Sequence, residues 1–497
     1  MAFEYNSPDR DQLYLLPPSI SEWLPESHLV WFVLDVVSIV DTSAFHARHP
    51  NDGVGRPAYD PEMMLGLLIY AYCAGLRSSR RIEVACRTDL AFRAVTVQLV
   101  PSHFAIARFR VDHETAIKNV FVDVLRLCAQ AGLADLGTIA IDGTKIGSDA
   151  ALDANRSASA IRDEVDRIMA EASTADSDLA QPTLRGELPD DLARRGSRRA
   201  RLEAALAEIE TQQRGADERS SVDPESEAAQ GRRLSGRKPK DAHAAARRAA
   251  ADVEALKVKA LSAKYANSRR SAAHKIAVAE QLADQARLTA AAVPVPELKA
   301  NTTDPQSRIM KTAAGWVQGF NAQAAVNAGQ VVIAAAVTQD NNDSQQLTPM
   351  MNAVQSNADM AALCGPVGVV LADAGYWSDK NASAEGPDRL IATTKDWKQR
   401  RKARELGLTE DPPPVGASQL DVMEHRLRTL EGATLYKLRS HTVEPVFGQI
   451  KENRGIRRFM RRGHTAAQSE WSLICTTNNI LKLFTRANGH TLASITT

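Results

Sequence analysis

The sequence of 497 residues has few cysteines and almost no excess charge, and both facts exclude classes of protein. Its five cysteines lie far apart and form no Cys-x-x-Cys pair, which argues against a cysteine zinc site and against a disulfide framework. Lys and Arg number 61 and Asp and Glu number 60, so the net charge of +1 neither requires nor excludes a nucleic-acid partner. The positions of the basic residues are therefore more informative than their number.

The sequence also lacks long apolar runs. The longest, at 29–40 and 63–74, are far shorter than the roughly 20 residues that a membrane span needs. The N-terminus shows no basic segment followed by an apolar stretch, so it does not predict a signal peptide. We expect a cytoplasmic protein without a membrane anchor.

Residues 1–135 contain short segments with the apolar spacing of helices. Asp60 and Pro61 predict a helix start, with Asp as N-cap and Pro in the first turn, and Ser78-Ser79 and Pro101-Ser102 predict two more. Arginines recur among these segments, at Arg77, Arg80, Arg81, Arg87, Arg93, Arg108 and Arg110. Two interpretations stay open: a small helical DNA-binding domain, or a helical bundle whose arginines are simply solvated.

Residues 150–300 are rich in Ala, Arg, Glu and Asp, and their one aromatic residue is Tyr265. Apolar residues recur here at i, i+4, i+7, which predicts helices with one narrow apolar face, as in a helical hairpin or short coiled coil. They are Ile161, Val165 and Ile168, and then Leu202, Leu206 and Ile209. The polar stretch 211–242 predicts a flexible linker.

The remaining chain alternates predicted strands and helices. Short apolar runs predict strands at 138–142, 316–326, 331–337, 367–373 and 390–394, with 327–329 as a hairpin turn. A helix with Asp343 as N-cap is expected before 367, and 438–486 is helical in pattern. If 150–300 is an insertion, the rest forms one α/β domain.

Two of the predicted strands end in an aspartate with a glycine within the next two residues, namely Asp142 and Asp373. Carboxylates at the ends of buried strands lie at the edge of an α/β sheet where ligands bind, and a neighbouring pair suits a divalent cation such as Mg²⁺. The alternative for each Asp-Gly alone is an ordinary turn.

A third candidate element runs from Tyr436 to Gly463. Glu444 and Lys451 are seven residues apart, so a helix would place them on one face. Basic residues would continue this face at Arg454, Arg457, Arg458, Arg461 and Arg462. Such a stripe can neutralise DNA phosphates, and the glutamate could complete a metal site. The alternative is a solvated basic helix with Glu444 in its first turn.

These elements together resemble the DDE transposases of bacterial insertion sequences, and most closely the group with a Tyr-Arg-Glu-Lys signature. The resemblance covers nearly the whole chain, including NTTDPQSRIMK at 301–311 and GWVQGFNAQAAV at 315–326. The three catalytic carboxylates match IAIDGTKI, VVLADAGYWSD and VEPVFGQIK, that is, Asp142, Asp373 and Glu444. Tyr436, Arg439 and Lys451 match the other signature positions, although Arg439 stands one residue further from the glutamate than in the signature.

The resemblance implies an α/β RNase H-like catalytic domain, with a mixed five-stranded sheet and helices, formed by 136–149 and 301–486. It implies an all-α N-terminal DNA-binding domain at 1–135 and leaves 150–300 as a helical insertion and 487–497 as a tail. The first and fourth strands would be adjacent and parallel, which would bring Asp142 and Asp373 together, with Glu444 approaching from a helix.

The implied activity is cleavage of DNA ends and strand transfer with two Mg²⁺ or Mn²⁺ ions, held by Asp142, Asp373 and Glu444. The partners would be double-stranded DNA, as terminal inverted repeats and target, and a second copy of the chain on paired ends, at the nucleoid in the cytoplasm. Tyr436, Arg439, Lys451 and the five arginines of the stripe would contact DNA. Two alternatives stay open: a co-opted, inactive DNA-binding protein, or a nuclease of the same fold without strand transfer.

Overall fold

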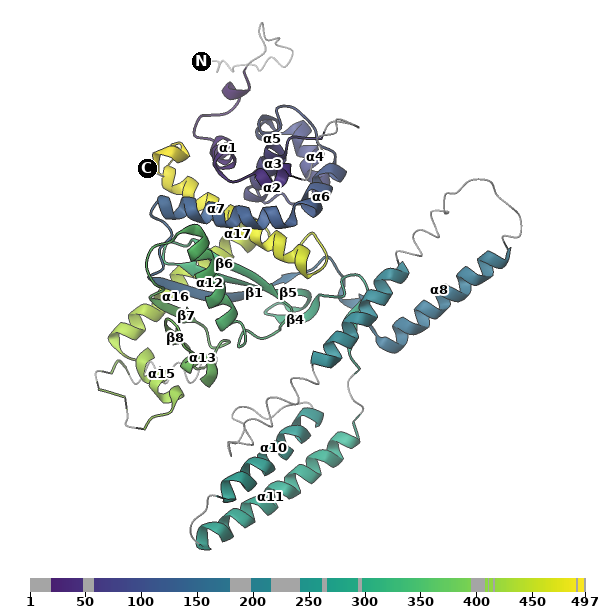
Figure 1. The fold of residues 1–497 in the computed structure, drawn as a ribbon, viewed down its shortest axis with the longest axis vertical. Coiled ribbons are helices and arrows are strands. Elements are labelled where there is room, and N and C mark those ends of the chain that lie inside the picture. Colours follow the sequence, from purple (N-terminus) through teal and green to yellow (C-terminus); the bar gives the residue numbers. More distant parts are fainter. Residues whose placement is uncertain are drawn as a thin grey trace, which may run out of the picture. The chain divides into compact units, whose positions relative to one another are not determined.

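The structure is a computed structural model that describes residues 19–47, 58–178, 198–215, 242–261, 266–293, 297–394, 407–409, 411–413, 416–488 and 490–495. The chain divides into two units (Figure 1). The first consists of Met1–Ala150 and Ser307–Thr497, and the second of Ala151–Gln306. None of the helices in the described ranges is long and apolar enough to cross a membrane.

The first unit begins with helices. They are α1 (Leu29–Ile39), α2 (Ser43–His46), α3 (Pro61–Cys73), α4 (Ser79–Thr88), α5 (Leu90–Val95), α6 (His103–Asp112) and α7 (Glu114–Gln130). Asp60 caps α3 as predicted, because its carboxylate accepts from the Met63 N–H at 2.8 Å, and Ser102 caps α6 in the same way. One continuous apolar core joins these helices to the sheet that follows.

The sheet contains β1 (Thr138–Gly147), β4 (Arg308–Thr312), β5 (Gly315–Asn327), β6 (Val332–Thr338), β7 (Val369–Ala372) and β8 (Asp388–Ile391). The order is β4-β5-β1-β7-β8, with β6 also paired to β5. β5 is long enough to pair with β4 through its first residues and with β6 through its last, along the edge opposite β1. The described sheet therefore has six strands rather than the expected five, and the additional one is β4.

The register between β1 and β7 decides where the candidate carboxylates lie. These strands are adjacent and parallel, as the resemblance implies, and their last pair is Ile141 with Ala372. The next residues on the two strands are Asp142 and Asp373. β7 ends at Ala372, one residue before the predicted end at Asp373, whereas the prediction that β1 ends at Asp142 was wrong. β1 continues through Gly143 to Gly147, because β5 remains paired beside it.

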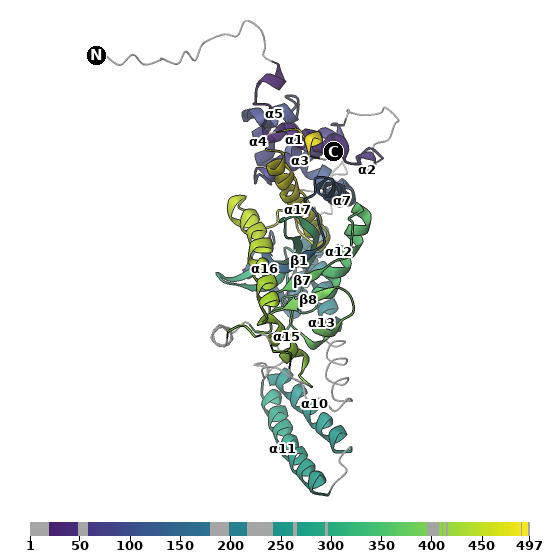
Figure 2. The same ribbon diagram turned by 90° about the vertical axis from the view of Figure 1, so that its left-hand side faces the viewer.

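Helices cover both faces of the sheet. They are α12 (Leu347–Ala361), α13 (Asp379–Ser383), α15 (Gln419–Leu427), α16 (Leu430–Gly448) and α17 (His464–Ala487). Figure 2 shows α16 on one side of the strands and α12 on the other. A π-helical turn, Gln449–Asn453, continues α16, and the chain then leaves the helix until His464.

The second unit is mainly helical. Its elements are β2 (Asn155–Ser157), α8 (Ala158–Asp178), a helix at 198–215, α10 (Ala242–Leu261), α11 (Ala266–Ala291) and β3 (Lys299–Asn301), which pairs with β2. The predicted apolar faces are confirmed, because Ile161, Ile168, Leu202 and Ile209 share one small core. α10 and α11 form a further pair around Ala251 and Ala255. Most of the linker predicted at 211–242 lies outside the described residues.

Candidate active site

Asp142 lies where β1 loses its β7 partner, and both of its carboxylate oxygens have a donor. Oδ1 accepts from the Gly143 N–H at 2.8 Å, and Oδ2 accepts from Nη2 of Arg439 at 2.6 Å. Burial raises the pKa of Asp142 to about 6 although Arg439 acts against it, and the charges of Asp373 and Asp343 raise it further. A site that raises the pKa of a carboxyl group in this way favours a cation beside it.

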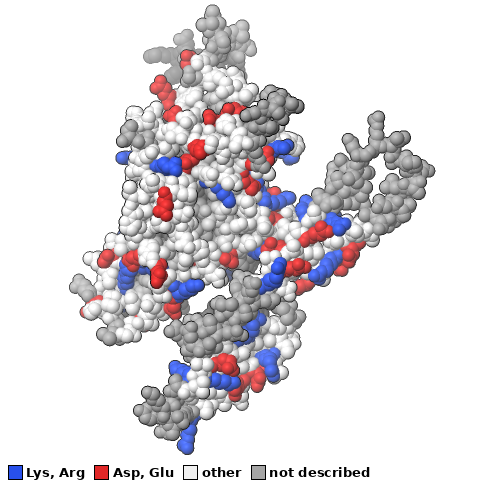
Figure 3. Space-filling view, in the orientation of Figure 1, with Lys and Arg blue, Asp and Glu red and all other residues white. Residues whose placement is uncertain are grey.

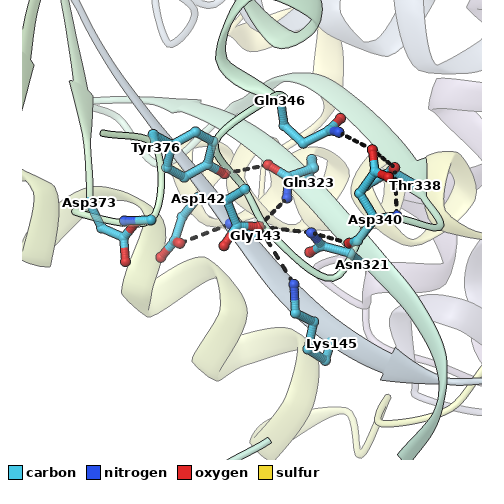
Figure 4. A network of polar contacts seen from close by, with 12 residues as sticks. Asp142, Gly143, Lys145, Asn321, Gln323, Thr338, Asp340, Gln346, Asp373 and Tyr376 are labelled. Carbon is cyan, nitrogen blue, oxygen red and sulfur yellow. Dashed lines mark hydrogen bonds and ion pairs between the residues drawn. The ribbon is translucent and has the colours of Figure 1, made fainter. Parts of the chain in front are cut away.

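Asp373 starts the turn that follows β7. Its carboxylate accepts from the Gly375 N–H at 2.7 Å, and its carbonyl accepts from the Tyr376 N–H at 3.1 Å. The turn places Asp373 near enough to Asp142 for the two charges to interact. Figure 4 shows both aspartates together, with the Tyr376 ring above them.

Glu444 comes from α16 and is the most exposed of the three carboxylates, at 55% of its side chain. Its Oε1 accepts from Nη1 of Arg439 at 3.2 Å. Arg439, at 13% exposure, thus bridges Glu444 and Asp142. Pro445 follows Glu444 inside the helix and cannot donate to the carbonyl of His441. That carbonyl accepts instead from Nε2 of Gln330, at 2.8 Å.

Two other members of the expected signature also lie on this side of the sheet. Lys451, in the π-helical turn, donates to the carbonyl of Lys145 on β1 at 3.0 Å, and burial lowers its pKa. Tyr436 is half-buried against the main core. Because the helix changes from α to π at Gln449, the α-helical spacing that we assumed between Glu444 and Lys451 does not hold. π-helical turns recur at functional sites.

The expected arginine stripe does not form a helix face, because Arg454–Gly463 is not helical and Gly455 has a φ of 64°. Arg454 is 7% exposed and donates to Oγ1 of Thr477 at 2.7 Å, and burial lowers its pKa to about 10. Arg461 is nearly buried and pairs with Glu114. These two guanidinium groups hold the fold together, so their expected position in an exposed DNA-binding stripe was wrong.

The other three arginines of the stripe remain exposed. Arg458 and Arg462 bind the two oxygens of Asp149, at 2.8 and 3.2 Å, and Arg457 pairs with Glu452. The backbone of this segment continues beside the end of β1, where the Gly147 N–H donates to the carbonyl of Arg457 at 3.0 Å. Arg457, Arg458 and Arg462 therefore form an exposed basic loop that is anchored to the strand carrying Asp142.

Substitutions at Arg454 and Arg458 test whether the buried arginine stabilises the fold and whether the exposed one contacts DNA, as the resemblance implies. We expect Arg454→Ala to lower the free energy of unfolding by about 2–4 kcal/mol, because it leaves a cavity and removes the donor to Thr477. It should leave the salt dependence of DNA binding unchanged. Arg458→Ala should be within about 0.5 kcal/mol of the wild type but reduce the salt slope of DNA binding by about 1. Urea denaturation and DNA titrations at several salt concentrations test both, and a reversed pattern would contradict the assignment.

The structure adds a polar network that sequence reasoning missed. Asp343 was expected to cap α12, but the N-cap is Gln346. Asp343 instead accepts from Asn321 at 2.7 Å and from Gln323 at 2.9 Å, and Lys145 lies 3.6 Å away. Figure 4 shows these three donors converging beside Gly143. The signal in the sequence was the pair Asn321 and Gln323, two polar residues at alternate positions of the predicted strand 316–326.

This network connects the strand that carries Asp142 to the turn that follows Asp373. Oε1 of Gln323 bonds to the Tyr376 hydroxyl, which belongs to the turn after Asp373. Burial, together with the charges of Asp343, Asp142 and Asp373, holds the pKa of Tyr376 well above its usual value, so its hydroxyl stays protonated and can donate. A Cβ at position 143 would approach Nε2 of Gln323 to 2.2 Å. Gly143 therefore leaves room for the side chains of this network and does not form a turn.

The donor chemistry of Asp142 and Asp373 fits a divalent cation, since the two neighbouring carboxylates offer oxygen ligands and the charge of Asp373 raises the pKa of Asp142. Glu444 is not gathered with them, because Arg439 lies between it and Asp142. Among the described residues, no three His, Cys, Asp or Glu side chains are placed to hold one ion. The three carboxylates thus converge on one region without forming a closed metal site.

Family models match two parts of the chain. Residues 18–112 match a family described as "Transposase domain (DUF772)", and residues 389–484 match one described as "Transposase DDE domain". The second match includes Arg439, Glu444 and Lys451, whereas Asp142 and Asp373 lie outside both. Comparisons with curated proteins and with solved structures gave no match. The two matches, one towards each end of the chain, support an insertion-sequence DDE transposase.

Proposed function

We propose that this transposase cleaves the DNA ends of its insertion sequence and joins them to target DNA, with Asp142, Asp373 and Glu444 as its catalytic carboxylates. The observation that carries the proposal is the register that leaves Asp142 and Asp373 as neighbours at the ends of paired parallel strands. Glu444 is tied to the same place through Arg439. The strand order, with β1 between an antiparallel and a parallel neighbour, supports an RNase H-like catalytic domain.

Two Mg²⁺ or Mn²⁺ ions held by these carboxylates would activate water or a DNA 3′-OH and stabilise the leaving oxygen. The charges and hydrogen bonds of the surrounding residues support this role. Asp142 is ionised near neutral pH, because its pKa is about 6. Its negative charge lies close enough to that of Asp373 for the two to interact. The hydrogen bond from the Tyr376 hydroxyl to Gln323 holds the turn after Asp373 in place. No side chain needs to act as a covalent nucleophile, so one site could serve both hydrolysis and strand transfer.

DNA would reach the site over basic residues of the first unit. Lys451 lies over β1, and the exposed basic loop of Arg457, Arg458 and Arg462 lies at the end of that strand. On the face seen in Figure 3, basic and acidic side chains are interspersed, which favours local phosphate contacts over one broad basic surface. We further propose that 1–135 binds terminal inverted repeats, that two copies act on paired ends, and that the chain belongs to the group with the Tyr-Arg-Glu-Lys signature.

Cleavage of DNA carrying the ends of the element tests this proposal. The wild type should cut at the ends with Mg²⁺ or Mn²⁺ and not with a chelator. Glu444→Gln should reduce cleavage at least about a hundredfold, because an amide removes a charge expected to be worth several kcal/mol at a metal site. Glu431→Gln, at the exposed start of the same helix, is the matched control and should cut normally. Specific binding without cleavage would favour the co-opted DNA-binding protein, and cutting without joining would favour a nuclease.

A further inference from the structure

Arg439 binds two of the proposed catalytic carboxylates, and these belong to different elements. It donates to Asp142 on β1 at 2.6 Å and to Glu444 on α16 at 3.2 Å. Its side chain is 13% exposed, so these contacts are largely shielded from water. Shielded contacts between charged groups are stronger than contacts at the surface. The guanidinium therefore serves as the counter-ion of the site in this structure.

A divalent cation and Arg439 would compete for the carboxylate oxygens of Asp142. The Gly143 N–H occupies Oδ1 of Asp142 and the arginine occupies Oδ2. Carboxylates bind Mg²⁺ or Mn²⁺ directly through oxygen. An ion at Oδ2 would compete with Nη2 for that oxygen, and repulsion between the two cations favours displacement of the guanidinium. Since Arg439 also holds Glu444, the same displacement frees the third carboxylate.

The guanidinium is incompletely satisfied where it is. Its Nε is buried and has no hydrogen-bond partner among the residues that the structure describes. A buried donor without a partner is unfavourable, so an arrangement that satisfies it competes well with the present one. The planar guanidinium matches phosphate oxygens, which can accept from Nε and an Nη together. A DNA phosphate at this site could therefore accept a hydrogen bond from Nε of Arg439, whereas the two carboxylates accept only from Nη1 and Nη2.

We propose that Arg439 is an exchangeable counter-ion, which closes the carboxylate site against divalent cations without DNA and releases it when a DNA phosphate binds the guanidinium. The inference rests on the proposed function, because it concerns the same three carboxylates. It explains why those carboxylates are not gathered into a metal site in the chain alone. It makes ion binding depend on DNA, so the site would be assembled only on its substrate.

The test is the binding of Mn²⁺ to the full chain without DNA, measured from the paramagnetic resonance signal of free Mn²⁺ at pH 8 and constant salt. Arg439→Gln should bind Mn²⁺ about tenfold more tightly than the wild type, because the ion no longer has to break two charge-assisted hydrogen bonds. Arg126→Gln, which removes an arginine paired with Asp123 on α7, should bind as the wild type does. Adding Asp142→Asn to Arg439→Gln should remove the gain.

A second arm uses the wild type alone. A short duplex DNA should raise its affinity for Mn²⁺ by a similar factor, after correction for ions bound by the DNA, and should raise that of Arg439→Gln much less. This arm keeps the test decisive if the variant folds poorly. Arg439→Lys, whose single ammonium cannot bridge both carboxylates, should fall between the two.

The outcomes separate the inference from the proposed function. Equal or weaker Mn²⁺ binding by Arg439→Gln, with binding that still depends on Asp142, would overturn the exchange and leave the metal site standing. Absence of Mn²⁺ binding in every variant, with and without DNA, would overturn both. Tighter binding that does not depend on Asp142 would place the ion elsewhere and would also overturn the exchange.

Discussion

Asp142→Asn is expected to lower metal-dependent DNA cleavage by about a thousandfold or more while leaving the fold intact. Asp142 interacts with both Arg439 and Asp373, and loss of a ligand charge worth several kcal/mol gives an effect of this size. Single-turnover cleavage of end DNA with saturating Mg²⁺ measures it. Asp359→Asn, at an exposed position of α12, is the control and should retain full activity. Cleavage by Asp142→Asn at the wild-type rate would exclude Asp142 from the chemistry.

The same variant should be more stable than the wild type at neutral pH in the absence of divalent ions. The pKa of Asp142 is about 6 in the folded protein, against 3.8 for an ordinary aspartate, so the folded chain holds this proton more tightly than the unfolded chain. The contribution of Asp142 to stability therefore falls as the pH rises from about 4 to 6. Above that range Asp142→Asn should gain up to about 3 kcal/mol over the wild type. Urea denaturation between pH 4 and 8 in a chelator gives the difference, and a variant less stable at pH 8 would show that the Arg439 pair outweighs burial.

Trp471→Ala should produce the largest loss of stability. Trp471 is fully buried on α17, its ring lies 6.4 Å from that of Phe447, and its Nε1 donates to the carbonyl of Gln323 at 2.8 Å. Truncation of a buried Trp lowers the free energy of unfolding by about 3–5 kcal/mol, because the apolar contacts of the ring are lost and the surrounding side chains only partly close the cavity. The loss of the indole donor also leaves a buried carbonyl on the strand that carries the polar network of the site. The free energy of unfolding of the first unit, followed by tryptophan fluorescence, measures the effect.

Trp316→Ala provides the matched control, because Trp316 lies on the same strand as Gln323 but is 61% exposed. Its replacement should change stability by no more than about 0.5 kcal/mol. Trp471→Phe should retain most of the packing and lose the hydrogen bond, at a cost of about 1 kcal/mol. Similar losses at positions 316 and 471 would contradict the packing described for α17.

The sequence predicted those parts of the fold that depend on local chemistry. The start of α3 at Pro61 needs only an N-cap carboxylate and a proline, and the hairpin between β5 and β6 needs only turn residues between two apolar runs. β4 was missed because its residues, Arg308–Thr312, alternate weakly and become a strand only through the long β5 beside them. The extension of β1 past Asp142 was missed for the same reason, since an Asp-Gly pair resembles a turn unless a partner strand is known.

The candidate site was predicted in composition but not in its contacts. Asp142 and Arg439 are 297 residues apart, and no local pattern reveals that they touch. The even spacing of the arginines suggested one exposed face, yet the partners of Arg454 come from α17, and Gly455 interrupts the helix. Asp343 had the local environment of a helix cap, and only the positions of Asn321 and Gln323 on β5 direct it to the site. Tertiary contacts between distant residues decided each of these cases.

The hydrogen bond from Gln330 to the carbonyl of His441 limits which sequence changes are tolerated in the turn between β5 and β6 and in α16 around Pro445. Pro445 leaves that carbonyl without its usual helical donor, and the turn between β5 and β6 supplies the replacement. Gln330 reaches it from a backbone with a φ of 63°, so the position of its side chain depends on the number of residues in the turn. Insertions or deletions between Asn327 and Val331 should therefore be rare among relatives that keep a proline after the glutamate, and should be tolerated where that proline is replaced.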